Sequence, residues 1–437
     1  MLNWIWLGLV VLSVVLGGVQ DRLPDVTRAA LEAAEFAVMK IALPLAGLWT
    51  LWLGMMRLAE RSGLVQTIAR VLRPIMKRLF PEVPADHPAM GSMVLNMAAN
   101  MLGLSNAATP LGLRAMRDLE KLNPHPGVAT NAMCTFLAIN TASIQLIPTT
   151  AISILAARGA KDPTAIIGTA LMASVCATTS AIIAVKLFQR LPFFGVSRSG
   201  AEGEMLTTEK PEEPDAAAIP VPAPLNLMGI FILILAAGFF GWLFYRNAFV
   251  VLPPEMAAAS MFQRVVRGVS LLAIPLLLGI MPLYAALRRV KVYEEFVEGA
   301  KEGFQVALRV IPFLVAILVA IGMFRAAGGI ELLARGLSPV LNALGFPVEL
   351  LPMVLVRPLS GSGTIGLFTD LVAQQGPDTL VSRMGATILG STETTFYVLA
   401  VYFGSVGIRR TRHAVPAGLV ADIVGVIASI TICRLMF

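Results

Sequence analysis

Two polar stretches inside apolar sequence decide the fold of this chain: "AINTASIQLIP" (138–148) and "LGSTETTFYVL" (389–399). Both place hydroxyl and amide side chains in sequence that otherwise has the character of a membrane helix. Only the second stretch carries a carboxylate, Glu393. An ionisable group at membrane depth is energetically unfavourable and by default marks a functional site. The two stretches therefore predict a polar site within a membrane protein.

The composition agrees with a membrane location. Of the 437 residues, 57% are hydrophobic and only 14% are charged, and the mean hydropathy is +0.77. A soluble domain carries about 25% charged residues. Apolar segments of about 20 residues, each long enough to cross a hydrocarbon core of about 30 Å, recur along the chain. We predict an all-α polytopic membrane protein with the bilayer as its solvent, and we interpret the first apolar segment as a retained span.

Several classes of protein are disfavoured by the sequence. The net charge of +7 comes from basic residues beside apolar spans, with no basic stripe interleaved with aromatics, so nucleic acid is not an expected partner. The three cysteines lie in apolar segments without CxxC spacing, and the three histidines are scattered, so we expect no metal site and no cofactor. Neither an HExxH nor a GxSxG motif is present, so we do not expect an enzyme.

The chain contains a colinear tandem repeat. "IALPLAGLWTLWLGMMRLAERSG" (41–63) resembles "VIPFLVAILVAIGMFRAAGG" (310–329), with Gly54 aligned to Gly322 and Arg57 to Arg325. Later matches follow in the same order, including Thr141 with Thr392, at offsets that only shrink along the chain. We therefore predict a first repeat over 1–195, a flexible linker rich in Pro, Glu and Ala over 196–225, an extra transmembrane helix and loop over 226–265, and a second repeat over 266–437.

The distribution of basic residues predicts that the two repeats are inverted in the membrane. The segment 57–78 contains six basic residues, whereas its counterpart 325–345 contains two. Basic residues favour cytoplasmic loops, so corresponding segments are expected on opposite sides, with the linker in the cytoplasm. Inverted repeats with broken helices are typical of secondary transporters, which bind substrate between the two copies. The basic, periodic segment 57–80 is expected to form an interfacial helix on the cytoplasmic leaflet.

Two further polar, glycine-rich stretches predict broken or re-entrant helices. They are "NMAANMLGLSNAATPLG" (96–112) and "RPLSGSGTIGL" (357–367), and Thr109 is expected to cap a helix that begins at Pro110. Together with the first pair they provide amides and hydroxyls that could line a cavity or serve tight packing. The predicted substrate-binding residues are Asn96, Asn100, Asn106, Asn140, Thr141, Ser143, Ser360, Ser362, Ser391, Thr392, Glu393 and Thr394.

Two roles remain open for Glu393. It could contact substrate or a coupling ion (sodium or a proton), a function for which Asp422 is the second candidate. Alternatively it could form a buried ion pair with Arg357, for which Asp422 would compete.

The longest motifs resemble a known family. "LNMAANMLGLSNAATPLGLRAMRDLEKLNP" (95–124) is similar to spore maturation protein A. The segment 356–422, which runs from "VRPLSGSGTIGLFTDL" to "GSTETTFYVLAVYFGSVGIRRTRHAVPAGLVAD", is similar to spore maturation protein B. Both belong to the nucleoside-recognition (Gate) family, which is distantly similar to concentrative nucleoside transporters. The resemblance implies an inverted-repeat, broken-helix fold, a ligand-binding role for Glu393, and a homo-oligomer, since nucleoside transporters form trimers.

The expected function is secondary transport of a small polar solute across the cell inner membrane by alternating access with proton or sodium coupling, with a nucleoside-like solute as one candidate. The alternative is a non-transporting membrane scaffold that acts in cell-envelope or spore maturation through partners.

Overall fold

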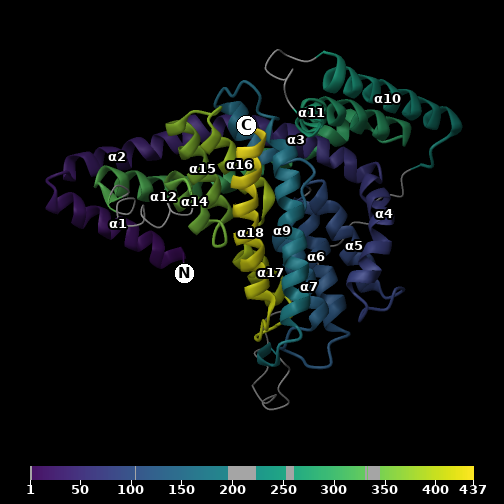
Figure 1. Ribbon diagram of the computed structural model, residues 1–437, viewed down its shortest axis with the longest axis horizontal. Coiled ribbons are helices and arrows are strands. Elements are labelled where there is room, and N and C mark those ends of the chain that lie inside the picture. The colour runs from purple at the N-terminus through teal and green to yellow at the C-terminus, as the bar shows by residue number, and fades with distance from the viewer. Residues whose placement is uncertain (1, 104, 195–222, 252–259, 330–331, 333–344) are drawn as a thin grey trace.

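The computed structural model is built from α-helices (Figure 1), and it describes residues 2–103, 105–194, 223–251, 260–329, 332 and 345–437. Within these residues no β-strand is formed, and the only β-type pairing is an isolated bridge between Val128 and Arg410. The prediction of an all-α polytopic protein is confirmed. In the part of the chain that the structure describes, six helices are long and apolar enough to cross a membrane: Leu23–Arg61, Ile166–Phe188, Leu227–Val250, Met261–Leu287, Val292–Ala326 and Ala414–Met436.

The order of helices repeats along the chain, as the sequence repeat predicts. The first half contains α1 (Leu2–Val19), α2 (Leu23–Phe36), α3 (Leu43–Arg61), α4 (Leu64–Leu79), α5 (Pro88–Met101), α6 (Ser105–Glu120), α7 (Asn131–Ala142), α8 (Thr149–Ala157) and α9 (Ile166–Phe188). After the helix α10 (Leu227–Tyr245), the second contains α11 (Met261–Leu287), α12 (Val292–Ala326), α14 (Leu351–Val356), α15 (Gly361–Gln375), α16 (Leu380–Ser391), α17 (Thr395–Gly404) and α18 (Ala414–Met436). In both halves a helical hairpin precedes a broken helix, and one long helix follows.

The last helices of the two halves form the centre of the molecule. In Figure 1, α9 and α18 run side by side through the middle, α1, α2 and α12 lie on one side, and α4, α5 and α6 lie on the other. Of the broken helix α7–α8, α7 packs against both central helices and α8 packs against α3 and α16, while α16 itself packs against both central helices. The two halves are therefore interleaved, and residues far apart in the sequence share one polar interior.

A second contact between the halves joins α3 to α12 at very short range. A Cβ added at Gly303 would lie 2.7 Å from Thr50 Cα, and one at Gly299 would lie 2.6 Å from the carbonyl oxygen of Leu53. Small residues allow membrane helices to approach in this way. At the end of this contact, the Arg57 guanidinium pairs with Glu295 at 3.0 Å and with Glu302 at 2.9 Å. Backbone contact and partly buried charge pairs thus hold one helix of each half together.

Two sequence predictions about helix ends are wrong. The basic segment 57–80 is not one helix, because Gly63 adopts a left-handed conformation (φ 80°) and separates α3 from α4. This conformation is favourable only for glycine. Pro110 does not begin a helix, because α6 already starts at Ser105 and contains the proline. The predicted linker 196–225 lies almost wholly outside the described residues, whereas the predicted extra helix is present as α10.

The halves meet again at the far end of the bundle, before α7 and α18. The backbone N–H of Ala129 donates to the Arg410 carbonyl at 3.0 Å, and the Arg410 N–H donates to the Gly127 carbonyl at 3.0 Å. The Arg412 side chain donates to the carbonyls of Ala129 and Phe194 at 3.0 and 2.9 Å. Next to it, His413 is fully buried, and neither of its ring nitrogens has a hydrogen-bond partner.

Substitution of Gly303 by alanine should destabilise the protein. The new methyl group would overlap the backbone of α3, and overpacking of this kind typically costs about 1–3 kcal/mol. We expect a lower thermal unfolding midpoint in detergent. The matched control is Gly47→Ala in α3, where an added Cβ meets nothing within 4 Å. Equal midpoints for the two variants would show that the close approach of α3 and α12 is wrong.

His413 should make the protein sensitive to acid. Burial, together with the positive charges of Arg412 and Lys186, lowers the pKa of His413 to about 4. The unfolded chain, with an ordinary histidine pKa of about 6.5, then binds a proton that the folded state resists. This contribution to stability is complete above about pH 6.5 and is lost as the pH falls toward 4. When the pH is lowered from 7 to 4.5, the unfolding midpoint of His413→Phe should fall by less than that of the wild type. The control His125→Phe, at an exposed position, should show the same fall as the wild type.

Candidate functional site

The two polar stretches that were predicted to form one site do meet. Helix α7 ends at Ala142 before α8 begins at Thr149, and α16 ends at Ser391 before α17 begins at Thr395. The backbone N–H of Glu393 donates to the carbonyl oxygen of Thr141 at 2.7 Å. The two helix breaks therefore contact each other through main-chain atoms, one residue away from the aligned pair Thr141 and Thr392.

Each break is also held by the helical hairpin of its own half. In the first half, the Leu146 N–H donates to the Met101 carbonyl, at the end of α5, with a distance of 3.0 Å. In the second, the Phe396 N–H donates to the Pro358 carbonyl, in the turn between α14 and α15, at 2.9 Å. Backbone groups released by a break in hydrocarbon need such partners. The predicted breaks at 96–112 and 357–367 are confirmed, and they support the central pair in the same way in both halves.

Glu393 borders a polar cavity of about 190 Å³. Its carboxylate accepts a hydrogen bond from Gln145 Nε2 at 2.7 Å, so that the side chains of the two breaks are linked as well as their backbones. Glycines and a proline leave backbone exposed around the cavity. Its lining is completed by Gly103, Pro148, Thr149, Thr150, Ala151, Arg357, Gly361, Ile365, Leu389 and Gly390.

Arg357 does not form the ion pair that the sequence suggested. Its guanidinium is buried, with 4% of the residue exposed, and it donates to the Leu389 carbonyl at 3.1 Å, at the end of α16. Among the ion pairs of the described residues, none joins it to Glu393 or Asp422 within 4.0 Å, although both carboxylates act on its charge. The carbonyl left free by the helix break takes the position that a carboxylate was expected to occupy. The Nε atom of Arg357 has no hydrogen-bond partner.

One face of α18 packs along the two breaks. Gly418 and Gly425 lie against the side chains of Thr395 and Thr392, since an added Cβ would meet their methyl groups at 2.8 and 2.7 Å. Between them lies Asp422, 6% exposed, whose Oδ2 accepts a hydrogen bond from the Thr395 hydroxyl at 2.5 Å. Several buried oxygens beside this face have no partner: Thr141 Oγ1, Thr392 Oγ1 and Asp422 Oδ1. Unpaired buried polar atoms are energetically unfavourable and rare in native proteins, so a group of them points to a functional role.

The predicted asparagines form a network behind the cavity. Asn100 donates to Asn140 Oδ1 at 2.8 Å, and Asn140 donates to the Phe136 carbonyl at 2.8 Å. Asn96 is fully buried and donates to the Ala108 carbonyl at 2.7 Å and to the Tyr402 hydroxyl at 3.3 Å. These three amides satisfy one another and nearby backbone; none of them is part of the cavity lining. The side chain of Asn106 lies outside the described residues.

The predicted hydroxyls take mainly local roles. Ser360 caps α15 by accepting a hydrogen bond from the Gly363 N–H at 3.0 Å, with the Ser362 hydroxyl 3.5 Å away. Ser391 contacts Ser429 of α18 at 3.3 Å, and Ser143 and Thr394 are buried in the two breaks. Gln145, Thr395 and Tyr402 were missed. Gln145 could have been found, because it is an amide in apolar sequence within the quoted stretch 138–148.

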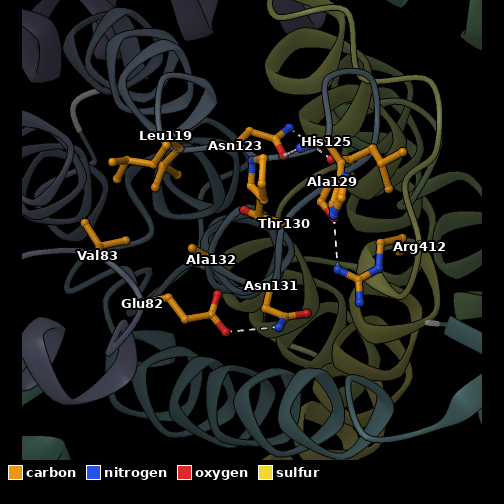
Figure 2. Close-up of a pocket in the computed structure, with 13 residues that line it drawn as sticks. Glu82, Val83, Leu119, Asn123, His125, Ala129, Thr130, Asn131, Ala132 and Arg412 are labelled. Atoms are coloured by element: carbon orange, nitrogen blue, oxygen red, sulfur yellow. Dashed lines mark hydrogen bonds between the residues drawn. The ribbon is translucent and has the colours of Figure 1, made fainter. Parts of the chain in front are cut away.

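A second cavity, of about 290 Å³, lies at the far end of the bundle and contains none of the predicted site residues. Figure 2 shows Glu82 accepting a hydrogen bond from Asn131 on one side, at 3.0 Å, and Arg412 bonded to Ala129 on the other. These polar groups hold the start of α7 and the connection between the halves. Among the described residues, no group of three His, Cys, Asp or Glu side chains is placed to hold a metal ion.

Comparisons with known proteins agree with the resemblance seen in the sequence. The chain is 44% identical over 175 residues to spore maturation protein B of Bacillus subtilis (strain 168), covering 40% of this chain and 98% of that protein. It is 43% identical over 188 residues to spore maturation protein A of the same organism, covering 43% and 95%. A crystal structure of the Alcanivorax borkumensis YdaH transporter aligns over 99% of this chain and 96% of that one, with 15% identity and a TM-score of 0.35.

The family profile described as nucleoside recognition (Gate) matches residues 42–189 and 307–409. The first segment contains α7, α8 and the hairpin α5–α6, and the second contains α14, α15, α16 and α17. The profile thus covers both helix breaks and more than half of the sequence, and the chain belongs to the nucleoside recognition (Gate) family.

Proposed function

We propose that this protein is a secondary transporter of the cell inner membrane that moves a small polar solute by alternating access. The observation that carries the proposal is the contact between the two helix breaks, with Glu393 of one break bonded to Thr141 and Gln145 of the other beside a polar cavity. Inverted-repeat transporters bind substrate at such a junction of unwound helices. The proposal includes the opposite orientation of the two halves and a cytoplasmic linker, which the charge pattern favours.

The proposed solute is nucleoside-like, with several hydroxyl or amide groups. The family profile that matches the chain carries the description nucleoside recognition. The cavity offers the Glu393 carboxylate as an acceptor and the Arg357 guanidinium as a donor, and it is lined by the glycines Gly103, Gly361 and Gly390. A volume of about 190 Å³ suits a small molecule and is below the range of about 300–1,000 Å³ typical of drug-sized ligands. In this proposal Glu393 contacts the solute directly.

The charges of the site support coupling to a cation. Arg357 offsets one of two carboxylates, the half-buried Glu393 and the buried Asp422, so a single negative charge remains if both are ionised. A buried charge is unfavourable unless it is compensated. One sodium ion or one proton would compensate it, and the unpaired oxygens of Asp422, Thr141 and Thr392 lie where that cation could bind. We therefore place coupling at Asp422 and solute binding at Glu393.

A second function is favoured by the relatives, both of which are named as spore maturation proteins. In this alternative the protein is a membrane scaffold in envelope or spore maturation and transports nothing. A scaffold would tolerate Glu393→Gln, provided that the variant folds, whereas a transporter would lose its phenotype.

Glu393→Gln should abolish solute-induced stabilisation. The purified protein in detergent would be heated with a panel of nucleosides, nucleobases, amino acids and dicarboxylates. A ligand at 100 times its Kd stabilises the folded state by about 2.7 kcal/mol, and removal of a charged hydrogen-bond partner should weaken binding at least tenfold. The control is Glu349→Gln, at an exposed position. A wild-type shift that Glu393→Gln retains would refute the site, and no shift from any ligand would favour the scaffold.

Asp422→Asn should remove the cation response while leaving solute binding measurable. We expect the wild-type midpoint, or its solute affinity, to change with sodium concentration or with pH, and the variant to respond at least tenfold more weakly. The asparagine has nearly the same shape and can still accept the hydrogen bond from Thr395, so the fold should be kept. Asp25→Asn, on the exposed part of α2, is the control. A variant that still responds like the wild type would exclude Asp422 from coupling.

A further inference from the structure

Helix α4 has features that the transport site does not use. It begins directly after the apolar span Leu23–Arg61, separated from it by the left-handed residue Gly63. Its inner face packs Val65, Ala69 and Met76 into the hydrophobic core, against α5. The helix is thus anchored to the protein along one face, at the end of a membrane span.

The outer face of α4 combines positive charge with exposed apolar side chains. Arg70, Arg73, Lys77 and Arg78 are all exposed, and between them Val71 and Ile75 are 69% and 54% exposed. Helices with this combination bind at the boundary between lipid headgroups and acyl chains. Among the described ion pairs, the only one on this face joins Arg73 to Asp86 at 3.9 Å, between side chains that are 55% and 100% exposed. Such a pair contributes little, so the positive charge is available to a ligand.

A cavity of about 400 Å³ opens beside this face, between α4 and the start of α5. Arg70 and Arg73 line it from α4, and Asp86 is the one carboxylate among its described lining residues. The first amides of α5 are already satisfied, since Ala89 N–H donates to His87 Nδ1 at 3.2 Å and Met90 N–H donates to the His87 carbonyl at 3.0 Å. Attraction for an anion here therefore comes from the two guanidinium groups.

We propose that this surface binds an anionic phospholipid, with its phosphate between Arg70 and Arg73 and its acyl chains over Val71 and Ile75. Guanidinium groups hydrogen-bond phosphate in a bidentate manner, and basic residues next to a membrane attract anionic lipids. The exposed apolar residues decide between a lipid and a soluble phosphate compound, because only the lipid offers chains to cover them. Asp86, at the rim, opposes the anion and limits its affinity.

Native mass spectrometry of the purified protein in detergent, titrated with phosphatidylglycerol or phosphatidylcholine, tests this proposal. We expect saturable adducts with phosphatidylglycerol, with affinity lowered roughly thirtyfold by the double substitution Arg70→Gln and Arg73→Gln, given the usual contribution of each basic residue at an anionic surface. Asp86→Asn should tighten binding. The matched control is Arg114→Gln with Arg117→Gln, an exposed pair at the same spacing on α6.

Three results would overturn the proposal. Equal loss in the control pair would indicate attraction to overall charge, and equal affinity for phosphatidylcholine would remove the need for an anionic headgroup. Displacement of phosphatidylglycerol by millimolar inorganic phosphate would assign the cavity to a soluble phosphate compound. The pair Arg70→Lys and Arg73→Lys keeps the charge but loses the bidentate hydrogen bonds, so its affinity for phosphatidylglycerol should lie between those of the wild type and the glutamine pair, which separates an electrostatic effect from misfolding.

Discussion

The structure depends on a single requirement, that backbone groups released by a broken helix inside a membrane must find partners. Helices α7–α8 and α16–α17 are both interrupted in the interior, and each interruption exposes carbonyls and N–H groups. The bond from Glu393 N–H to the Thr141 carbonyl satisfies two of them across the repeat, and the bonds from Leu146 and Phe396 satisfy two more. One bond thus joins the two breaks and two more hold each break to its own half, and the meeting of the two broken helices creates a polar interior.

The same requirement explains the position of Arg357. A buried guanidinium would ordinarily be expected beside a carboxylate, yet here it donates to the Leu389 carbonyl, which the end of α16 leaves without a helical partner. Glu393 is then bonded by the neutral amide of Gln145, and Asp422 by the hydroxyl of Thr395. The charges are close enough to influence one another without direct pairing, so that each retains capacity to bind something else. This arrangement is more consistent with a working site than with a structural ion pair.

Much of this organisation could be predicted from the sequence, and the exceptions have physical causes. The alignment of Thr141 with Thr392 predicted which backbone segments would meet, because a repeat with a polar interruption must bury both interruptions together. The partners of the asparagines could not be predicted, because Asn96 bonds Tyr402 across 306 residues, and its nearest acceptor is a backbone carbonyl that only the turn between α5 and α6 brings into reach. The helix ends near Gly63 and Pro110 were mispredicted, because glycine adopts helical and left-handed conformations alike, and proline, with its fixed φ, can lie inside a helix as well as in its first turn.

The glycine contact between α3 and α12 has a mechanical consequence. Where a Cβ at Gly299 or Gly303 would overlap the opposite backbone, no side chains lie between the helices to deform or change rotamer. Two helices in backbone contact, with Arg57 paired to two glutamates at one end, form a unit that resists relative movement. Because α3 belongs to the first half and α12 to the second, this pair of helices is shared by both halves. A conformational change that preserved this contact would have to occur elsewhere in the protein, so its boundary would not coincide with the boundary of the repeat.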